Sequence, residues 1–203
     1  MLWRLLVCVF VGFFLGGLNG AILISRFCMK GDIREKGSGN AGLTNYLRIY
    51  GGWNTLLVVL IDGGKVILAC LLAKWLLPEY AEEAKMITGA AVQIGHIFPL
   101  LFHLQGGKGI LCSGFLALMM DWRIFLVAFG VFVIAFLLTN YVSLGSILAT
   151  VVYAVGFVIV FHDKPVIWGM AVFMAALAIF MHRSNIGRLI RRTENKTYLT
   201  NRK

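Results

Sequence analysis

Long apolar runs, separated by short polar segments, dominate the chain. Seven apolar stretches can be distinguished, at about residues 4–25, 53–77, 86–104, 110–120, 124–139, 145–161 and 166–181. A run of roughly 20 apolar residues is long enough to cross the hydrocarbon core of a bilayer as a helix. We therefore predict an all-α integral membrane protein, a bundle of seven transmembrane helices forming a single polytopic domain over residues 1–203. The third to fifth stretches are short for a crossing, so we expect some helices to extend into the flanking polar loops.

The composition agrees with a membrane location. Of the 203 residues, 60% are hydrophobic and 14% are charged, which is more apolar surface than a soluble domain of this size needs. The first stretch lacks a clear small-x-small cleavage site, so we expect a retained span rather than a signal peptide. Three cysteines, Cys8, Cys70 and Cys112, lie in apolar stretches with no metal or disulfide spacing, and we expect them to be buried small hydrophobes.

The charged residues are distributed unequally between the two faces that an odd number of crossings defines. One face receives the 26–52 loop, the 105–109 turn, the 139–144 turn and the tail from His182. It carries thirteen basic and three acidic residues, a net charge of +10, whereas the other face carries five of each. Because basic loops stay on the cytoplasmic side, we predict that the N-terminus is outside and the C-terminus is cytoplasmic.

Two polar islands rich in glycine, Lys36 to Asn45 and Gln105 to Gly109, interrupt the apolar pattern. Glycine clusters with interleaved Ser, Asn, Thr and Lys expose backbone N–H groups, which is how many proteins cradle phosphate. Both islands face the cytoplasm by the charge argument. The second is not a Walker A loop, because Ile110 follows Gly109, so the sequence does not support nucleotide binding. Glycines that serve only turns or helix packing are the alternative interpretation.

Ionisable residues inside the spans are candidates for function by default. Asp62 and Lys65 are three positions apart in the second stretch, close enough to pair on one helical face. A structural ion pair and a functional pair are equally good interpretations of this spacing. His96 fits a structural histidine better than a base, while His182 stands beside polar residues at the end of the last span. No cluster of His, Cys, Asp and Glu has metal-ligand spacing, so we expect no metal and no cofactor.

Four ordered motifs, which extend over nearly the whole chain, resemble those of the bacterial acyl-phosphate:glycerol-3-phosphate acyltransferases, the PlsY family. They are Gly37-Ser38-Gly39-Asn40-x-Gly42-x-Thr44-Asn45, then Gly95-His96-x-x-Pro99 with Gly106-Gly107-Lys108-Gly109, then Tyr141-x-Ser143-Leu144-x-Ser146, and finally His182-Arg183-x-Asn185. The chain departs from the family pattern at three places. Val66 stands where the family commonly has glycine, Gln105 stands where lysine is frequent, and no glycine precedes Glu194.

The resemblance implies an enzyme of phospholipid biosynthesis. In this family a fatty acyl group passes from acyl phosphate to the 1-hydroxyl of sn-glycerol 3-phosphate, giving lysophosphatidic acid and phosphate. The family's fold is a seven-helix bundle in the bacterial cytoplasmic membrane, with the active site facing the cytoplasm. The partners implied are the two substrates and membrane lipids, with no nucleic acid and no obligate protein partner.

The resemblance also implies roles for individual residues. The residues expected to bind glycerol 3-phosphate are Ser38, Arg48, Lys108, His182 and Asn185, of which Lys108, Ser38 and Asn185 are expected to be catalytic. Those expected to bind acyl phosphate are Asn40, Thr44, Gly106, Gly107, Lys108, Gly109 and Ser143. The family has been argued to lack a protein general base, with the acceptor's own phosphate assisting proton transfer.

A small membrane transporter or flippase for phosphorylated solutes or lipids is the main alternative. Such a protein needs a path to the outer face, yet the loops expected there, 78–85, 121–123 and 162–165, are short and carry no matching motif. A purely structural subunit is disfavoured because the polar motifs concentrate on one face. The His-x4-Asp signature of acyl-CoA-dependent glycerolipid enzymes is absent, which favours acyl phosphate as the donor.

Overall fold

The computed structural model describes residues 1–198, in which every regular element is a helix. Arg202 and Lys203, which contribute to the charge of the predicted cytoplasmic face, lie outside the described residues. The helices group into two compact units, Met1–Met120 and Asp121–Lys203. The single polytopic domain expected from the sequence stays a prediction.

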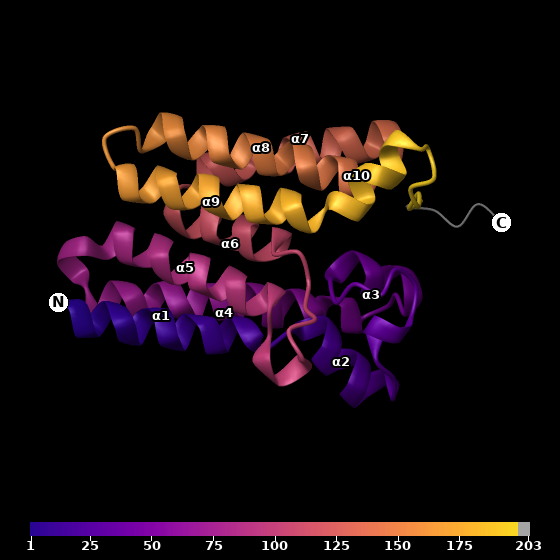
Figure 1. The fold of residues 1–203 in the computed structure, drawn as a ribbon, viewed down its shortest axis with the longest axis horizontal. Helices are drawn as coiled ribbons and strands as arrows, with labels where there is room; N and C mark the ends of the chain where they lie inside the picture. The colour runs from indigo at the N-terminus through magenta and orange to yellow at the C-terminus, as the bar shows by residue number, and fades with distance from the viewer. Residues whose placement is uncertain (199–203) are drawn as a thin grey trace. The chain divides into compact units, whose positions relative to one another are not determined.

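The first unit is built around a bundle of long helices (Figure 1). Its α-helices are α1 (Leu2–Gly17), α2 (Gly20–Met29), α3 (Leu43–Ile49), α4 (Asn54–Leu76), α5 (Ala81–Ile97) and α6 (Ile110–Met120). Three short 3-10 helices, η1 (Ile33–Glu35), η2 (Pro78–Tyr80) and η3 (Leu100–Phe102), lie in its loops. α1 packs against α4 and α5, and α6 packs against the same two helices.

Glycines allow close backbone approach between α1 and α5 in this unit. A Cβ on Gly16 would lie 2.2 Å from the carbonyl oxygen of Val92, and one on Gly95 would lie 2.0 Å from that of Phe13. Any larger side chain at either position would force the two helices apart. Small residues allow this close backbone approach in membrane bundles, where van der Waals packing drives helix association.

The first apolar stretch, predicted as one span, is broken into α1 and α2 at Leu18 and Asn19. The Asn19 side chain caps α2 by accepting a hydrogen bond from the N–H of Ile22 at 3.0 Å. The ammonium group of Lys65, on α4, donates to the carbonyl oxygens of Gly16 and Leu18, both at 3.0 Å. These bonds satisfy backbone groups that the break leaves without helical partners, so the break is stable within an apolar environment.

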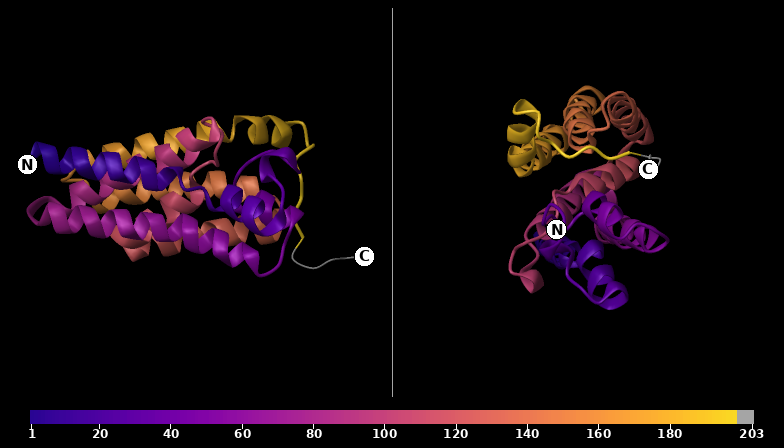
Figure 2. Two further views of the ribbon diagram at one scale, coloured as in Figure 1. Left: turned by 90° about the horizontal axis from the view of Figure 1, so that it is seen from below. Right: turned by 90° about the vertical axis from the view of Figure 1, so that its right-hand side faces the viewer.

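The second unit consists of α7 (Trp122–Thr139), α8 (Val142–Val160), α9 (Pro165–Met181) and α10 (Arg183–Ile190). α8 packs against both α7 and α9, and Figure 2 shows these three helices of the unit in two further views. Asn140 adopts the left-handed conformation, with φ of 61°, and ends α7 before the tight turn into α8. α10 is bent by 56° from α9 at His182.

The number of spans differs from the sequence-based expectation. Five segments of the described residues are long and apolar enough to cross a membrane, and α9 with α10 makes a sixth if the bent pair is one span. α6 has 11 residues, which at about 1.5 Å per residue cover roughly 16 Å, well short of a bilayer core of about 30 Å. α5 and α7 begin earlier than expected, as the short stretches required, but α6 does not. The seven-span count therefore stays a prediction.

The three cysteines of the apolar stretches are buried, which confirms the sequence-based expectation, whereas Cys28 is exposed. Many large apolar side chains of the long helices are also exposed, including Phe10, Leu60, Leu138 and Phe173. In water such a surface would be unusual, but lipid covers it in a membrane.

Candidate active site

The first glycine island is a loop held from inside by the side chain of Asn45, on α3. The Asn45 carboxamide oxygen accepts from the N–H of Ser38 at 3.0 Å, and its amide donates to the carbonyl of Lys36 at 2.9 Å. Gly37 adopts φ of +60°, and a Cβ there would lie 2.4 Å from the carboxamide oxygen of Asn45. The loop therefore requires glycine at position 37 and presents Ser38 as an exposed side chain.

The structure brings the two glycine islands together within the first unit. A Cβ on Gly107 would lie 2.9 Å from the carbonyl oxygen of Ala41, so the two loops touch through their backbones. The same carbonyl accepts a hydrogen bond of 2.9 Å from the side chain of Asn19, at the break between α1 and α2. The sequence predicts a shared face for the islands, and the fold places them in direct contact.

The second island closes the C-terminal end of α5. The N–H groups of Gly106 and Gly107 donate to the carbonyls of Ile97 and His96, each at 3.1 Å. These two N–H groups are therefore engaged by the protein rather than directed at a ligand. The island's remaining features are the Lys108 side chain and Gly109, with φ of +81°, just before the N-terminus of α6. A helix N-terminus favours anions, so the end of the island next to α6 suits an anion better than the turn at Gly106 and Gly107.

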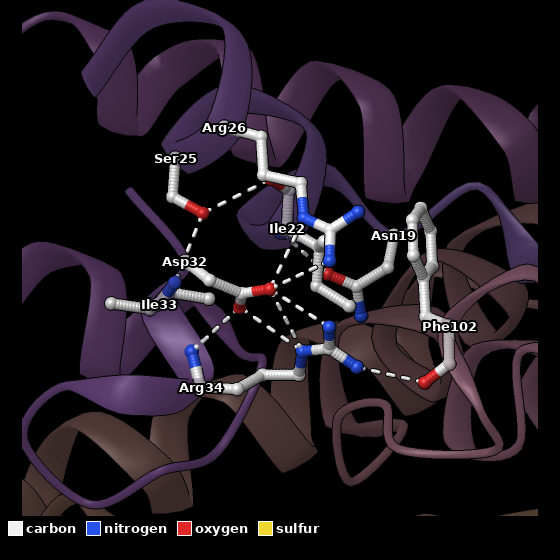
Figure 3. Close-up of polar contacts among 8 residues, drawn as sticks. All are labelled: Asn19, Ile22, Ser25, Arg26, Asp32, Ile33, Arg34 and Phe102. Carbon is white, nitrogen blue, oxygen red and sulfur yellow. Dashed lines mark hydrogen bonds and ion pairs between the residues drawn. The ribbon is translucent and has the colours of Figure 1, made fainter. Parts of the chain in front are cut away.

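An arginine pair clamps the end of α2 to η3 (Figure 3). Asp32 accepts from the guanidinium groups of Arg26 and Arg34, at 2.9 and 2.8 Å. Arg34 also donates to the carbonyl of Phe102 at 2.7 Å, and both guanidinium groups lie over its ring. The hydrogen bonds from Arg34, and then those from Arg26, hold the pKa of Asp32 well below its ordinary value although burial opposes this. Asp32 is thus an ionised structural anchor, unsuited to accept a proton from a substrate.

A second charged cluster is buried where α1, α4 and α5 meet. Lys65 donates to the carboxylate of Asp62 at 2.8 Å, which confirms that the two residues pair. The Nδ1 atom of His96 lies 2.9 Å from the Lys65 ammonium and 3.5 Å from the Asp62 carboxylate. All three side chains are nearly inaccessible to solvent. His96 is thus a hydrogen-bonded structural histidine, as its sequence context suggested.

In the second unit, Glu194 collects three hydrogen bonds from residues of α8 and α10. Ser143 and Asn185 donate to one carboxylate oxygen, at 3.0 and 2.7 Å, and Arg188 donates to the other at 2.6 Å. Burial alone would raise the pKa of Glu194, but these three hydrogen bonds lower it below its ordinary value. The tail that carries Glu194 is fixed by a backbone hydrogen bond from Thr197 to Asn140.

His182 stands at the junction of α9 and α10 in the same unit. Its Nδ1 atom lies 2.8 Å from the carbonyl of Ala178, one turn earlier. The ring is 3% exposed, and this hydrogen bond fixes its orientation by donating from Nδ1. The hydrogen bond places Nε2 on the opposite edge of the ring.

The predicted site residues are divided between the two units. The first unit holds Ser38, Asn40, Thr44, Arg48, Gly106, Gly107, Lys108 and Gly109, and the second holds Ser143, His182 and Asn185. Ser38 and Arg48 are exposed, whereas the three residues of the second unit are buried. Within residues 1–198, no group of three or more His, Cys, Asp or Glu side chains is arranged to hold a metal ion.

Comparison with known proteins identifies the family. The family model for glycerol-3-phosphate acyltransferases matches residues 6–192. The chain belongs to the glycerol-3-phosphate acyltransferase family. It is 37% identical to the glycerol-3-phosphate acyltransferase of Thermoanaerobacter pseudethanolicus over 186 residues, which are 92% of each chain. The family member from Finegoldia magna is also 37% identical, over 95% of this chain and 96% of that one.

Solved structures of a member of this acyltransferase family have the same fold. The glycerol 3-phosphate form of PlsY (YgiH), an integral membrane glycerol 3-phosphate acyltransferase, superposes with a TM-score of 0.87 and 31% identity, covering 96% of both chains. Its lysophosphatidic acid form superposes with a TM-score of 0.84, also at 31% identity. The chain is therefore a multi-pass membrane protein of the acyltransferase family.

Two organising residues of this acyltransferase were not assigned roles from the sequence. Asn45 lies inside the first motif, and its position at the start of a helix after a glycine loop is a signal for a bracing side chain. Glu194 is the only acidic residue in the basic tail after His182. An isolated acid among arginines is a usable signal for an ion pair, but the sequence does not reveal that Ser143 and Asn185 share it.

Proposed function

We propose that this chain transfers a fatty acyl group from acyl phosphate to the 1-hydroxyl of sn-glycerol 3-phosphate, giving lysophosphatidic acid and phosphate in phospholipid biosynthesis. The observation that carries the proposal is the match of fold and sequence to PlsY over 96% of both chains. That protein has been crystallised in a glycerol 3-phosphate form and a lysophosphatidic acid form. These two compounds are the acceptor and the product of the proposed transfer.

We assign glycerol 3-phosphate to Ser38, Arg48, Lys108, His182 and Asn185. Arg48 and Lys108 carry positive charge that offsets the charge of an acceptor phosphate, and Ser38 is exposed in the first glycine island. We assign acyl phosphate to the residues Asn40, Thr44, Gly106, Gly107, Lys108, Gly109 and Ser143. The N–H groups of Gly106 and Gly107 are engaged by α5, so these glycines shape the loop, and Lys108 supplies its charge.

The chemistry needs positioning and charge stabilisation more than a protein base. The oxygen of the 1-hydroxyl attacks the acyl carbonyl carbon, the bond from that carbon to the phosphate oxygen breaks, and phosphate departs as the leaving group. The hydroxyl proton passes to the acceptor's own phosphate. Two carboxylates that flank the motifs, Asp32 and Glu194, are ionised in hydrogen-bonded pairs with arginines and are held as anchors. Lys108 and Arg48 bring two anionic substrates together and offset their repulsion.

We further propose the topology predicted from the charge pattern. The N-terminus is outside, the C-terminus is cytoplasmic, and the active site faces the cytoplasm of a bacterial cell. The break between α1 and α2 and the short α6 both lie in the first unit, where glycine islands need irregular backbone near the membrane surface. Seven spans are reached if the bent pair of α9 and α10 is the sixth span and α6 is the seventh. In that case α6 is a short helix that packs against α4 and α5. The substrates and membrane lipids are the partners in this proposal, without a cofactor.

Phosphate release from purified protein in lipid tests the function. Palmitoyl phosphate and glycerol 3-phosphate are supplied together and then separately, and lysophosphatidic acid is measured in parallel. We expect phosphate release only when both substrates are present, with one lysophosphatidic acid formed per phosphate. Folded protein that shows no turnover contradicts the proposal and favours a transporter of phosphorylated compounds.

A further inference from the structure

Lys65 has more contacts than an ion pair requires. Its ammonium lies within hydrogen-bond distance of four groups: the carbonyls of Gly16 and Leu18, each at 3.0 Å, the carboxylate of Asp62 at 2.8 Å, and Nδ1 of His96 at 2.9 Å. The Lys65 side chain is 3% exposed and that of Asp62 is 1% exposed. A buried charge costs stability unless it is fully paired. An ammonium group has three N–H donors for these four neighbours, so at least one N–H is shared between two of them, and His96 Nδ1 accepts as the fourth.

The contact with Lys65 fixes which edge of the His96 ring faces the second glycine island. Nδ1 points to Lys65, and the opposite atom, Nε2, lies against Gly107, where a Cβ would be 2.2 Å away. The backbone carbonyl of His96 also accepts the N–H of Gly107 at 3.1 Å. Both the main chain and the ring of His96 therefore support the residue that precedes Lys108.

We propose that Lys65 is a positioning residue, which acts through the His96 ring to hold Gly107 and Lys108 in the geometry that binds substrate. The proposal rests on the proposed function, because it assigns Lys108 to the substrate phosphates. Lys65 also donates to the carbonyls of Gly16 and Leu18 at the break between α1 and α2. One buried ammonium group therefore connects this break with α4, α5 and the second island. All of these elements belong to the first unit.

The geometry makes a specific prediction about two substitutions. In Gly107→Ala, the new methyl group meets the His96 ring, which is unable to swing away while Lys65 holds Nδ1. In Lys65→Met, that hold is lost, and the ring rotates away from position 107. The nearest remaining neighbour of the methyl group is then the carbonyl oxygen of Ala41, at 2.9 Å, so part of the crowding is relieved. The loss of kcat/KM caused by Gly107→Ala should therefore be smaller in the Lys65→Met protein than in the wild type.

A double-mutant cycle tests this, with wild type, Lys65→Met, Gly107→Ala and the double variant. We expect each single change to lower kcat/KM for acyl phosphate by about 10- to 100-fold. We expect kcat/KM of the double variant to be about tenfold higher than the value obtained by multiplying the two single losses, as for residues that share one partner. Effects that multiply, or a Lys65→Met protein with wild-type kinetics, overturn the proposal. Asp62→Asn/Lys65→Met provides a background without a buried unpaired carboxylate.

Folding and phosphate binding are measured separately from turnover. Circular dichroism in detergent reports folding, and inorganic phosphate, the product, should raise the unfolding temperature of the wild type more than that of Lys65→Met. If neither Lys65→Met nor Asp62→Asn/Lys65→Met folds, the buried Lys65 contacts stabilise the helix bundle rather than position the loop, and the proposal fails. A wild-type protein without turnover contradicts the proposed function instead, and the phosphate-dependent unfolding temperatures then still decide the role of Lys65.

Discussion

The side-chain amide of Asn185 donates a hydrogen bond to the carboxylate of Glu194 at 2.7 Å, across the end of α10. This contact orients a residue proposed to bind glycerol 3-phosphate by means of a residue nine positions later in the chain. The same carboxylate oxygen accepts from Ser143, on α8. Glu194 thus connects the third and fourth motifs of the acyltransferase family through one side chain.

Replacing Glu194 with glutamine keeps the shape of the side chain but removes the charge that Arg188 and Asn185 contact. We expect the folded protein to lose about 1 to 3 kcal/mol of stability, as for hydrogen bonds to a charged group. Thermal unfolding of the two proteins at pH 7 measures the loss. An unchanged unfolding temperature would show that the charge of Glu194 contributes no net stability.

The same pair of proteins yields a pH dependence. The folded pKa of Glu194 lies below its ordinary value of 4.5, so its contribution is fully present above that value and is lost as the pH falls through the folded pKa. Asp32 titrates in the same direction, so the wild type alone does not separate the two residues. The stability difference between wild type and Glu194→Gln should shrink as the pH falls below 4.5, and a constant difference contradicts the assignment.

Asn185→Ala removes the amide from the proposed acceptor site. We expect KM for glycerol 3-phosphate to rise by about tenfold or more, because a hydrogen bond to a charged phosphate is lost. Initial rates at varied glycerol 3-phosphate, with saturating acyl phosphate, measure this change. Ser184→Ala, at the preceding exposed position, is the matched control. An unchanged KM and kcat would remove Asn185 from the site.

Lys108→Ala removes the positive charge of the second glycine island. We expect kcat/KM to fall by about 100-fold or more, the usual size for loss of a group that stabilises charge in the transition state, while folding is retained. Lys74→Ala, an exposed lysine near the end of α4, controls for loss of a lysine elsewhere. Full activity of Lys108→Ala in folded protein contradicts the role assigned to this loop.

Gly37→Ala tests how strongly the first island depends on its backbone. Position 37 has positive φ and faces Asn45 at close range, whereas Gly52 has φ of +68° and open space, with nothing within 4 Å of where a Cβ would stand. Gly52→Ala therefore measures the backbone strain alone, about 1 to 2 kcal/mol. We expect Gly37→Ala to be less stable than this control and to lose activity, since the new methyl group displaces the Asn45 carboxamide that accepts the hydrogen bond from the Ser38 N–H. Equal behaviour of the two variants would show that the Asn45 contact is unimportant.

The proposed topology has a direct chemical test. Cys28 is the exposed native cysteine, while Cys8, Cys70 and Cys112 are buried. In a Cys28→Ser background, a cysteine replacing Lys203 should react with a membrane-impermeant maleimide only from the cytoplasmic side. Lys203 lies outside the described residues. Labelling in intact cells, before the membrane is opened, contradicts the proposed orientation.

Much of the fold and of the candidate site follows from local patterns in the sequence. Apolar runs predict membrane helices because each residue contributes its own transfer free energy. The ion pair of Asp62 and Lys65 follows from a spacing of one helical turn, and the three buried cysteines follow from their apolar neighbours. The motif residues could be recognised because glycine-rich polar segments are exceptional in a chain of this composition.

Tertiary structure decided what those residues contact. Lys65 bonds Gly16, 49 positions earlier, and Ser143 bonds Glu194, 51 positions later. The N–H groups of Gly106 and Gly107 turned inward to α5 instead of outward to a ligand. The reason is that a buried polar group must find a partner wherever packing brings one within about 3 Å. Sequence patterns fix which residues need such partners, whereas the distances between packed helices determine which partners they find.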